Sequence, residues 1–319
     1  MRLKRSCVRS GVYMSEMKVV FLGTSSARPT LHRNTTSVAL CYGSDVLLFD
    51  CGEGTQVRIM QSTVRASRFS AICLSHFHGD HVNGLPGLLG TMGLNDRKDP
   101  LTLVGPKGTP LWLKTLRQLQ ILNPSFPIEV VEHGDEEVLR GKGWSLKTVP
   151  LIHRIPTVGY RFDEEDLPGR FDAARAKELG VPFGPLYGCL QRGEDITLED
   201  GRVVHAAELV GPPRKGRRIA IITDTRPSDK VIDFVRGVDL LIHEATYGDD
   251  EHAQAHARYH STASQAATIA AKAGVKQLYL THFSSKYVRV QPLVAQARAI
   301  FPNTMAAKDL DEVSLPVPD

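Results

Sequence analysis

One short segment constrains this chain more than any other, because three histidines and an aspartate fall within six residues. It reads His76-Phe77-His78-Gly79-Asp80-His81 and follows an apolar run, residues 70–75, that is typical of a buried strand. Imidazoles and carboxylates are ligands for zinc and other first-row metals. In an extended backbone His76 and His78 project to one side, while Gly79 turns the next two ligands towards a second position. The segment predicts a metal site at a strand end.

The rest of the chain predicts a layered α/β protein. Of its 319 residues 42% are hydrophobic, which is enough for a large core. Short apolar runs alternate with helical patterns, and the helix expected over 261–273 opens with Ser-Thr and ends at Gly274. We expect strands at 18–23, 37–41, 46–51, 70–75, 101–104, 128–131, 144–149, 219–223, 238–242 and 277–281, with further helices at 54–60, 83–94 and 109–122.

Residues 161–210 depart from this alternation. Glycine and proline recur there, and 11 acidic residues against 6 basic ones give a local net charge of −5. A charged stretch of this length between core strands predicts an inserted excursion. The alternative is an ordinary surface subdomain without a function of its own.

The N-terminal residues, the lengths of the apolar runs and the cysteines indicate where in the cell the protein is located. We expect residues 1–16 to be a disordered tail before a domain over 17–319, and the chain shows no apolar run long enough to span a membrane and no secretory signal. Five cysteines without a C-x-x-C pair indicate a reducing compartment, so we expect a cytoplasmic protein. The role of Cys189 is not readable from the sequence.

The histidine-rich motif resembles the hallmark of the metallo-β-lactamase superfamily. This resemblance implies a four-layer αββα sandwich and supplies three more ligands, His153, Asp224 and His282, each at or just beyond an expected strand end. It assigns His76, His78 and His153 to one ion and Asp80, His81 and His282 to the other, with Asp224 shared. Imidazole and carboxylate ligands suit two Zn²⁺ per subunit, with Mn²⁺ as the alternative.

Within that superfamily the chain resembles the ribonuclease Z family in its short form, along nearly all of its length from Met17. The matching blocks are residues 21–24 (FLGT), 33–37 (RNTTS), 49–53 (FDCGE), 75–81 (SHFHGDH), 84–88 (GLPGL), 105–108 (GPKG), 243–246 (HEAT) and 260–262 (HST). The resemblance implies an endoribonuclease that removes the 3′ trailer from tRNA precursors. A metal-held hydroxide would attack the phosphorus, leaving a 3′-hydroxyl on the tRNA and a 5′-phosphate on the trailer.

The same resemblance suggests roles for individual residues. Asp80 would be both a ligand and the proton acceptor, and His260 would protonate the leaving oxygen or steady the phosphate charge. Glu244 would orient a histidine. For His260 and Glu244 the competing interpretations are a histidine flanking a helix and a surface glutamate.

The excursion at 161–210 falls where the family carries a flexible tRNA-binding arm. Gly184 and Pro185 stand at the position of the Gly-Pro-rich tip of that arm. A homodimer is implied, in which the arm of one subunit serves the active site of the other. The arm's net −5 is unlike a phosphate-binding surface, so we expect the body to supply most charge neutralisation. The basic clusters are Arg214, Lys215, Arg217 and Arg218, and Arg58, Arg65 and Arg68.

Two other functions remain open from the residues alone. A dinuclear site also suits a hydrolase of esters, thioesters or lactones, although such an enzyme has no reason to carry a tRNA-binding arm. A metal-stabilised RNA-binding protein without catalysis is the third hypothesis, which the complete ligand set disfavours.

Overall fold

The computed structural model describes residues 16–134 and 137–318. Apart from Glu16, the tail expected at 1–16 lies outside these residues. The described chain divides into two compact units. One comprises residues 16–163 and 217–316, and the other comprises residues 164–216 and 317–318.

The first sheet of the larger unit combines antiparallel and parallel strands. Pairing is antiparallel from β18 to β4 and parallel from β4 to β7. Among the described residues the order is β18 (Glu312–Leu315), β1 (Met17–Gly23), β3 (Ser37–Tyr42), β4 (Asp45–Phe49), β5 (Phe69–Cys73), β6 (Leu101–Gly105) and β7 (Ile128–Glu132). Its helices are α1 (Thr55–Gln61), α2 (Gly79–Val82), α3 (Leu85–Leu94) and α4 (Thr109–Gln118).

The second sheet of this unit has a parallel centre, in which β13, β14, β15 and β17 run together. Within the described chain its order is β17 (Thr304–Ala306), β15 (Gln277–Thr281), β14 (Leu240–Glu244), β13 (Arg218–Ile222), β10 (Thr157–Glu164), β9 (Trp144–Leu151) and β8 (Glu137–Gly141). The helices that follow its strands are α7 (Asp229–Phe234), α8 (His252–Arg258), α9 (Ala263–Ala273) and α10 (Gln291–Arg298). A short parallel pair, β2 (Ser25–Ser26) and β16 (Phe283–Ser284), lies outside both sheets.

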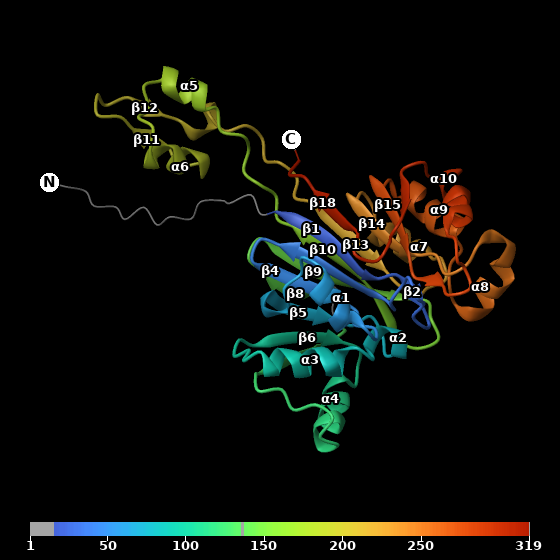
Figure 1. Ribbon diagram of the computed structural model, residues 1–319. Helices are drawn as coiled ribbons and strands as arrows, with labels where there is room; N and C mark the ends of the chain where they lie inside the picture. The colour runs from blue at the N-terminus through green and yellow to red at the C-terminus, as the bar shows by residue number, and fades with distance from the viewer. Residues whose placement is uncertain (1–15, 135–136, 319) are drawn as a thin grey trace. The chain divides into compact units, whose positions relative to one another are not determined.

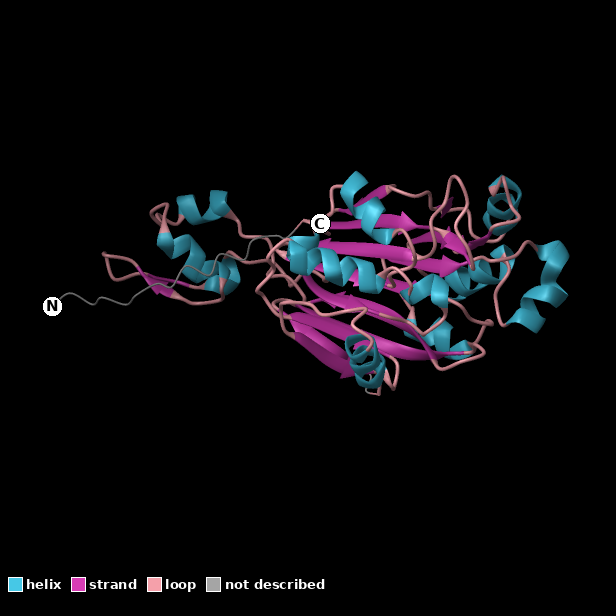
Figure 2. Ribbon diagram, turned by 60° about the horizontal axis from the view of Figure 1, so that its bottom comes forward, coloured by secondary structure: helices cyan, strands magenta, loops and turns pink. Residues whose placement is uncertain are grey.

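The burial of β1 explains the layering. Val19 and Phe21 belong to the core between the two sheets, whereas Val20 and Leu22 belong to the core under α1, α3 and α4. A strand buried on both faces reads as one continuous apolar run, since successive side chains point to opposite faces. A third core joins the second sheet to α7, α9 and α10. Figures 1 and 2 show the resulting order of helices, sheet, sheet and helices, which confirms the predicted αββα sandwich.

Several expected boundaries move by a few residues for local reasons. The helix α9 begins at Ala263 because Thr262 is its N-cap, in a capping box with Gln265. The helix α4 ends at Gln118, four residues earlier than expected, because Gln120 adopts a left-handed φ of 56°.

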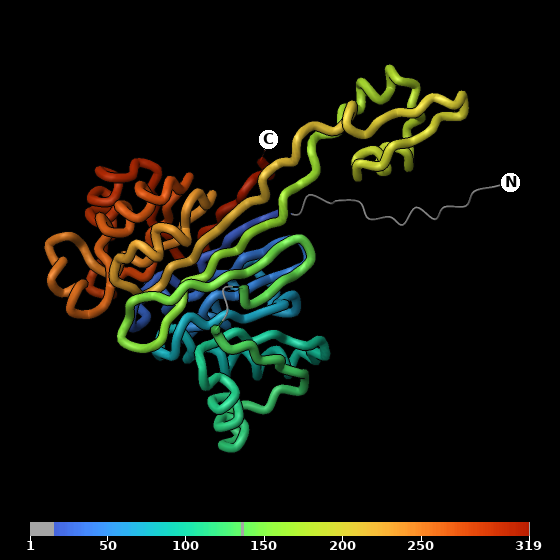
Figure 3. The backbone as a smooth tube through the Cα atoms, turned by 180° about the vertical axis from the view of Figure 1, so that it is seen from behind, coloured from blue at the N-terminus to red at the C-terminus, as the bar shows by residue number. Residues whose placement is uncertain are grey.

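The smaller unit contains more regular structure than its sequence pattern indicated. It holds α5 (Ala173–Glu178), α6 (Pro185–Gln191) and a hairpin of β11 (Ile196–Thr197) and β12 (Val203–Val204). These elements are too short to show a periodicity. They enclose a core of their own: Ala176, Val181, Leu190, Ile196, Val204, Ala206 and Leu209. The chain enters and leaves this unit as two adjacent passages (Figure 3), bridged between Leu167 and Arg214.

The structure also shifts the limits of the excursion. Residues 161–163 pair with β13 and belong to the core sheet, and the smaller unit runs from 164 to 216 rather than from 161 to 210. Strand β10 continues through charged residues because Asp163 is paired with Arg161 and Arg218.

Candidate metal centre

The seven proposed ligands come from four places in the larger unit, each just after a strand. His76 and His78 follow β5, while Asp80 and His81 lie in α2. The other three are His153 after β9, Asp224 after β13 and His282 after β15. The structure brings all seven together, as a group of His76, His78, His153 and Asp224 and a group of Asp80, His81 and His282.

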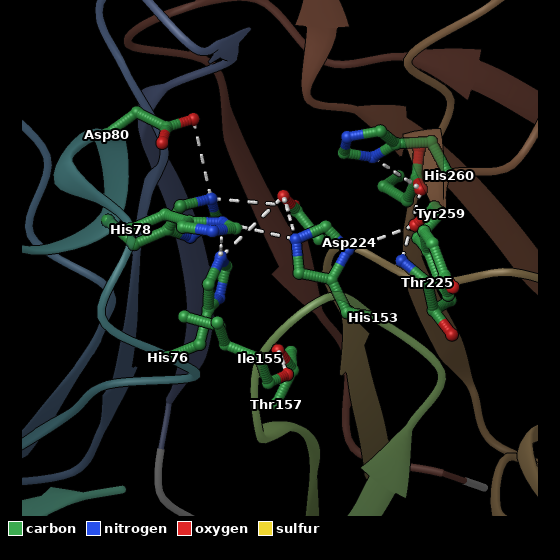
Figure 4. A network of polar contacts seen from close by, with 12 residues as sticks. His76, His78, Asp80, His153, Ile155, Thr157, Asp224, Thr225, Tyr259 and His260 are labelled. Carbon is green, nitrogen blue, oxygen red and sulfur yellow. Dashed lines mark hydrogen bonds and ion pairs between the residues drawn. The ribbon is translucent and has the colours of Figure 1, made fainter. Parts of the chain in front are cut away.

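Asp224 is within 4 Å of members of both groups, and Figure 4 shows it beside the first group, His76, His78 and His153. Its Oδ2 is 3.7 Å from His76 Nε2 and 3.6 Å from His153 Nε2. Its Oδ1 is 3.4 Å from His81 Nε2 and 3.1 Å from His282 Nε2. Asp80 Oδ2 completes the second group at 3.5 Å from both of these nitrogens. One carboxylate thus offers one oxygen to each group, as a bridging ligand does.

Side-chain atoms at this centre fit a cation better than they fit one another. His78 Nδ1 is 2.9 Å from His76 Nε2 and 3.1 Å from His153 Nε2, so three ring nitrogens converge at hydrogen-bonding distance. His81 Nε2, His282 Nε2 and Asp224 Oδ1 are buried without a hydrogen-bond partner among the described residues. Orphaned buried polar atoms are costly, and coordination of divalent metal satisfies them together.

A buried carboxylate that the sequence did not single out, Asp50, fixes two of these histidines. Its Oδ2 accepts a bond of 2.7 Å from His81 Nδ1 and another of 2.8 Å from the Ser75 hydroxyl. The Ser75 oxygen is 2.9 Å from His76 Nδ1 and must therefore accept from it. Both rings then hold the proton on Nδ1 and present the Nε2 lone pair to the centre.

The second sheet orients two further histidines in the same way. Thr246 donates to Glu244 Oε2 at 2.7 Å, so its oxygen accepts from His282 Nδ1 at 2.9 Å. His153 Nδ1 donates to the carbonyl oxygen of Tyr259 at 3.0 Å. His282 and His153 thus also present Nε2 as a free ligand atom.

A sequence signal for Asp50 and Thr246 did exist. Each follows a strand that runs parallel to a ligand-bearing neighbour, β4 beside β5 and β14 beside β15. Carboxyl ends of parallel strands meet at one edge of a sheet. Thr246 also ends the block His243-Glu244-Ala245-Thr246, of which only Glu244 was given a role.

Close backbone packing holds Asp50 against the ligand-bearing helix. A Cβ at Gly52 would lie 2.4 Å from the carbonyl oxygen of Asp80, and one at Gly84 would lie 2.0 Å from that of Gly52. No side chain fits at either position, so glycine permits this approach.

His260 lies beside the ligands and contacts Glu244. Its Nδ1 is 3.1 Å from Glu244 Oε1, which also accepts from the Ser261 amide at 2.8 Å. Burial lowers the pKa of His260, but Glu244 and Asp224 outweigh it and raise this pKa to about 9. Glu244 is fully buried, so it is not the surface glutamate of the competing interpretation. It contacts His260 directly and His282 through Thr246.

Burial and neighbouring charges shift the pKa values of the ligands in different directions. Burial alone would lower the pKa of His81, but the carboxylates of Asp224, Asp50 and Asp80 raise it well above its ordinary value. Burial likewise opposes ionisation of Asp224, yet His282 and His81 hold its pKa well below the usual range. For His76 and His153 burial outweighs Asp224 and lowers the pKa, so these imidazoles are neutral and can offer a lone pair to a metal ion.

A hollow of about 390 Å³ opens onto this centre. Its wall includes Asp80, His260, Arg154 and Arg258, so a phosphate in it would meet both the ligand groups and two cations. In contrast, one member of the basic cluster expected at 214–218 does not lie at the surface. Arg217 is 1% exposed and donates to the carbonyl oxygen of Leu315.

Comparisons with known proteins agree with this fold and site. Residues 17–157 match the family model "Anti-Pycsar protein Apyc1", and residues 202–283 match "Beta-lactamase superfamily domain". The chain is 42% identical over 307 residues to ribonuclease Z of Acaryochloris marina, covering 94% of this chain and 98% of that one. It is 43% identical over 308 residues to ribonuclease Z of Myxococcus xanthus, covering 96% and 100%.

Among solved structures, the short form of human tRNase Z is similar. It shares 27% identity with a TM-score of 0.69, over 94% of this chain and 100% of that one. Because full-length relatives exceed 40% identity, the resemblance inferred from the motifs is confirmed. The chain belongs to the ribonuclease Z family, the metal-dependent endoribonucleases that remove the 3′ trailer from tRNA precursors.

Proposed function

We propose that this chain cleaves tRNA precursors at a dinuclear zinc centre, leaving a 3′-hydroxyl on the tRNA and a 5′-phosphate on the trailer. Asp224 carries the proposal, since its two oxygens face two separate ligand groups. His76, His78 and His153 would hold one ion, and Asp80, His81 and His282 the other. Manganese is the alternative metal, because every ligand atom is nitrogen or oxygen.

When bound, two divalent cations polarise the scissile phosphate and promote ionisation of water. The chain's own groups then position and move protons. Asp80 Oδ2 accepts a bond of 2.7 Å from the Ala27 amide, which fixes this carboxylate at the wall of the hollow as a proton acceptor. His260, kept protonated by Glu244, faces the same hollow as the proton donor to the leaving 3′-oxygen.

The smaller unit is proposed as the tRNA-binding arm, with Gly184 and Pro185 at its contact point. Nothing lies within 4 Å of a Cβ built on Gly184, whose φ is 151°, so the backbone there is open to a ligand. The preceding Phe183 is 92% exposed and rests edge-on against Tyr187, with ring centroids 5.5 Å apart. Tyr187 in turn packs on Phe171. An exposed aromatic ring supported from below is a stacking platform for bases.

The cations of this unit are mostly engaged within it. Arg175 pairs with Glu178, Arg192 with Glu194, and Arg202 with Asp200. Backbone donors and the aromatic tip are therefore better suited than Lys and Arg to contact RNA here. This supports the hypothesis that the larger unit supplies most of the charge neutralisation.

We propose a homodimer, which the family resemblance implies and which exposed apolar side chains of the larger unit support. Large apolar side chains that are more than half exposed occur on α1, α3 and α4 and in the loop after α4: Val57, Met60, Leu94, Leu111, Leu119 and Ile121. Pairing of two copies would remove such exposed apolar side chains from water.

A cytoplasmic location stays a prediction. No helix in the described part of the chain is long and apolar enough to cross a membrane.

The test is incubation of the zinc-loaded protein with a 3′-extended tRNA precursor, followed by mapping of both new ends. The proposal expects a single cut with a 3′-hydroxyl on the tRNA. A hydrolase of esters, thioesters or lactones would leave the precursor intact and turn over such a small ester instead. An RNA-binding protein would retain the precursor and cleave neither substrate.

A further inference from the structure

The larger unit carries a second hollow, which is larger than the catalytic one. Its volume is about 880 Å³, against about 390 Å³ for the catalytic hollow. It is bounded by the loop before β3, the start and outer face of α10, and β17 with the residues after it. None of the groups assigned above to metal binding or proton transfer lines it.

The wall of this groove combines positive charge with apolar surface. Arg289, Arg298 and Lys308 are exposed cations in it, and Val288 and Met305 are apolar side chains that are 92% and 40% exposed. The one carboxylate of the wall, Asp309, is engaged elsewhere: it accepts from the Asn34 amide and the Thr24 hydroxyl and pairs with Arg58. The groove therefore carries net positive charge.

Two of these cations differ from the third in their contacts. Within residues 16–134 and 137–318, no side chain or backbone group forms a hydrogen bond or ion pair with the side chain of Arg289 or Lys308. Arg298 differs, since its Nε donates to the carbonyl oxygen of Thr304. Arg289 and Lys308 are thus available to phosphate groups, while Arg298 also ties α10 to β17.

The groove and the catalytic hollow are lined by different residues of the same two chain segments, 26–33 and 284–291. Ser26 and Ser285 line the catalytic hollow, whereas Arg33 and Val288 line the groove. Between them Arg28 Nε donates to the Ser285 hydroxyl at 3.0 Å, and β2 pairs with β16. Ser285 and Val288 are three residues apart, so the borders are separated along the chain by at most about 11 Å. A few nucleotides span that distance.

We propose that this groove binds the single-stranded 3′ trailer of the precursor as it leaves the catalytic hollow. The inference rests on tRNA-precursor cleavage at that hollow. Proteins bind single-stranded RNA by placing cations along the phosphates and apolar surface against the bases. The trailer meets this requirement, whereas the tRNA side of the cut adjoins a base-paired stem whose bases cannot spread over Val288 and Met305.

The test compares two precursors, one with a trailer of a single nucleotide and one with a trailer of about ten. The test variant is Arg289→Glu/Lys308→Glu. The matched control, Lys142→Glu/Lys272→Glu, makes the same change of charge at exposed lysines outside both hollows. Steady-state KM and kcat are measured for each protein on each precursor across a range of salt concentrations.

For the unmodified protein we expect a lower KM for the long trailer. The test variant should lose that advantage, with KM for the long trailer raised about tenfold and KM for the short one nearly unchanged. Each lost phosphate contact on a single strand reduces the slope of log KM against log salt by about 0.7, so the two together should reduce it by about 1.4. The control should behave like the unmodified protein.

Three results would overturn the inference: equal KM values for both trailers in the unmodified protein, equal losses on both in the test variant, or a changed oligomeric state of that variant by sedimentation. The last would make the groove an interface between two copies of the chain. If the unmodified protein cleaves neither precursor, the proposed function fails instead, so the two failures are distinguishable.

Discussion

The catalytic hollow and the arm unit use polar side chains in opposite ways. At the metal centre His76, His81, Asp224 and His282 are buried, and the histidines have a partner that fixes their orientation. In the arm the charged residues are exposed and pair with neighbours close in sequence, as Arg192 does with Glu194. One region arranges polar groups for a ligand, and the other satisfies them with one another.

This difference in polar side chains indicates which residues of each region are available to bind a ligand. The second ring nitrogen, Nε2, of His81 and His282 is buried without a partner among the described residues, which is costly unless a bound group satisfies it. Exposed ion pairs contribute little to stability and carry no such implication. In the arm, the feature without a local explanation is an apolar one, the exposed Phe183 ring. Substitutions should therefore remove chemistry in the hollow and substrate affinity in the arm.

The largest effect is expected for Asp224→Ala. It removes the one carboxylate that faces both ligand groups, so cleavage should fall below detection and bound zinc should drop from two equivalents towards none. His282→Ala, which touches one group, should retain about one equivalent. Elemental analysis of the purified proteins measures both. The control is Asp233→Ala at the exposed end of α7, and a single equivalent in the unmodified protein would contradict the dinuclear proposal.

Next in size is His260→Ala. If His260 delivers the proton to the leaving oxygen, single-turnover cleavage should slow by about 100-fold or more, the range for a lost general acid. Zinc content should stay at two equivalents. His256→Ala, an exposed histidine in α8, is the matched control. Near-normal cleavage by His260→Ala would exclude this role.

The comparison also explains what the sequence could predict. The ligand motif is local, whereas Asp224 and His282 were identified through the resemblance to the metallo-β-lactamase superfamily, which their positions just after short apolar runs support. A layered α/β fold is predictable because runs such as Val19–Leu22 are apolar throughout and are buried on both faces, and the resemblance supplied the αββα order. These features depend on neighbours close in sequence or on simple topology.

The contacts that orient the ligands depend on tertiary packing and were not predicted. Asp50 reaches His81 across 31 positions, and Thr246 reaches His282 across 36. The burial of one member of the basic cluster, Arg217, was missed for the same reason, because its contacts with Tyr42 and the carbonyl oxygen of Leu315 follow from tertiary packing rather than from composition. The aromatic support under Phe183 likewise requires the fold of the arm.

A smaller effect at the metal centre is expected for Asp50→Asn, because this residue contacts the ligands and not the metal. The amide keeps the shape but removes the charge that holds the Nδ1 proton of His81. Loss of such an outer carboxylate weakens metal affinity by about 10- to 100-fold, which chelator competition measures. Asp45→Asn, at the other end of β4, is the control and should leave zinc affinity unchanged. Unchanged affinity in Asp50→Asn would mean that Ser75 alone orients these rings.

The smallest effect is expected in the arm, for Phe183→Ala. Stacking of one base on an aromatic side chain contributes about 1 kcal/mol or more, so KM for a tRNA precursor should rise about fivefold. Turnover of a small phosphodiester should not change, because no metal ligand or proton-transfer group lies in residues 164–216. Phe183→Trp keeps a ring and should restore the affinity. A side chain 92% exposed contributes little to the fold, so the melting temperature should stay the same for both variants. Equal losses on the two substrates would assign Phe183 a structural role, and an unchanged KM would mean that the tip binds RNA through its backbone at Gly184 alone.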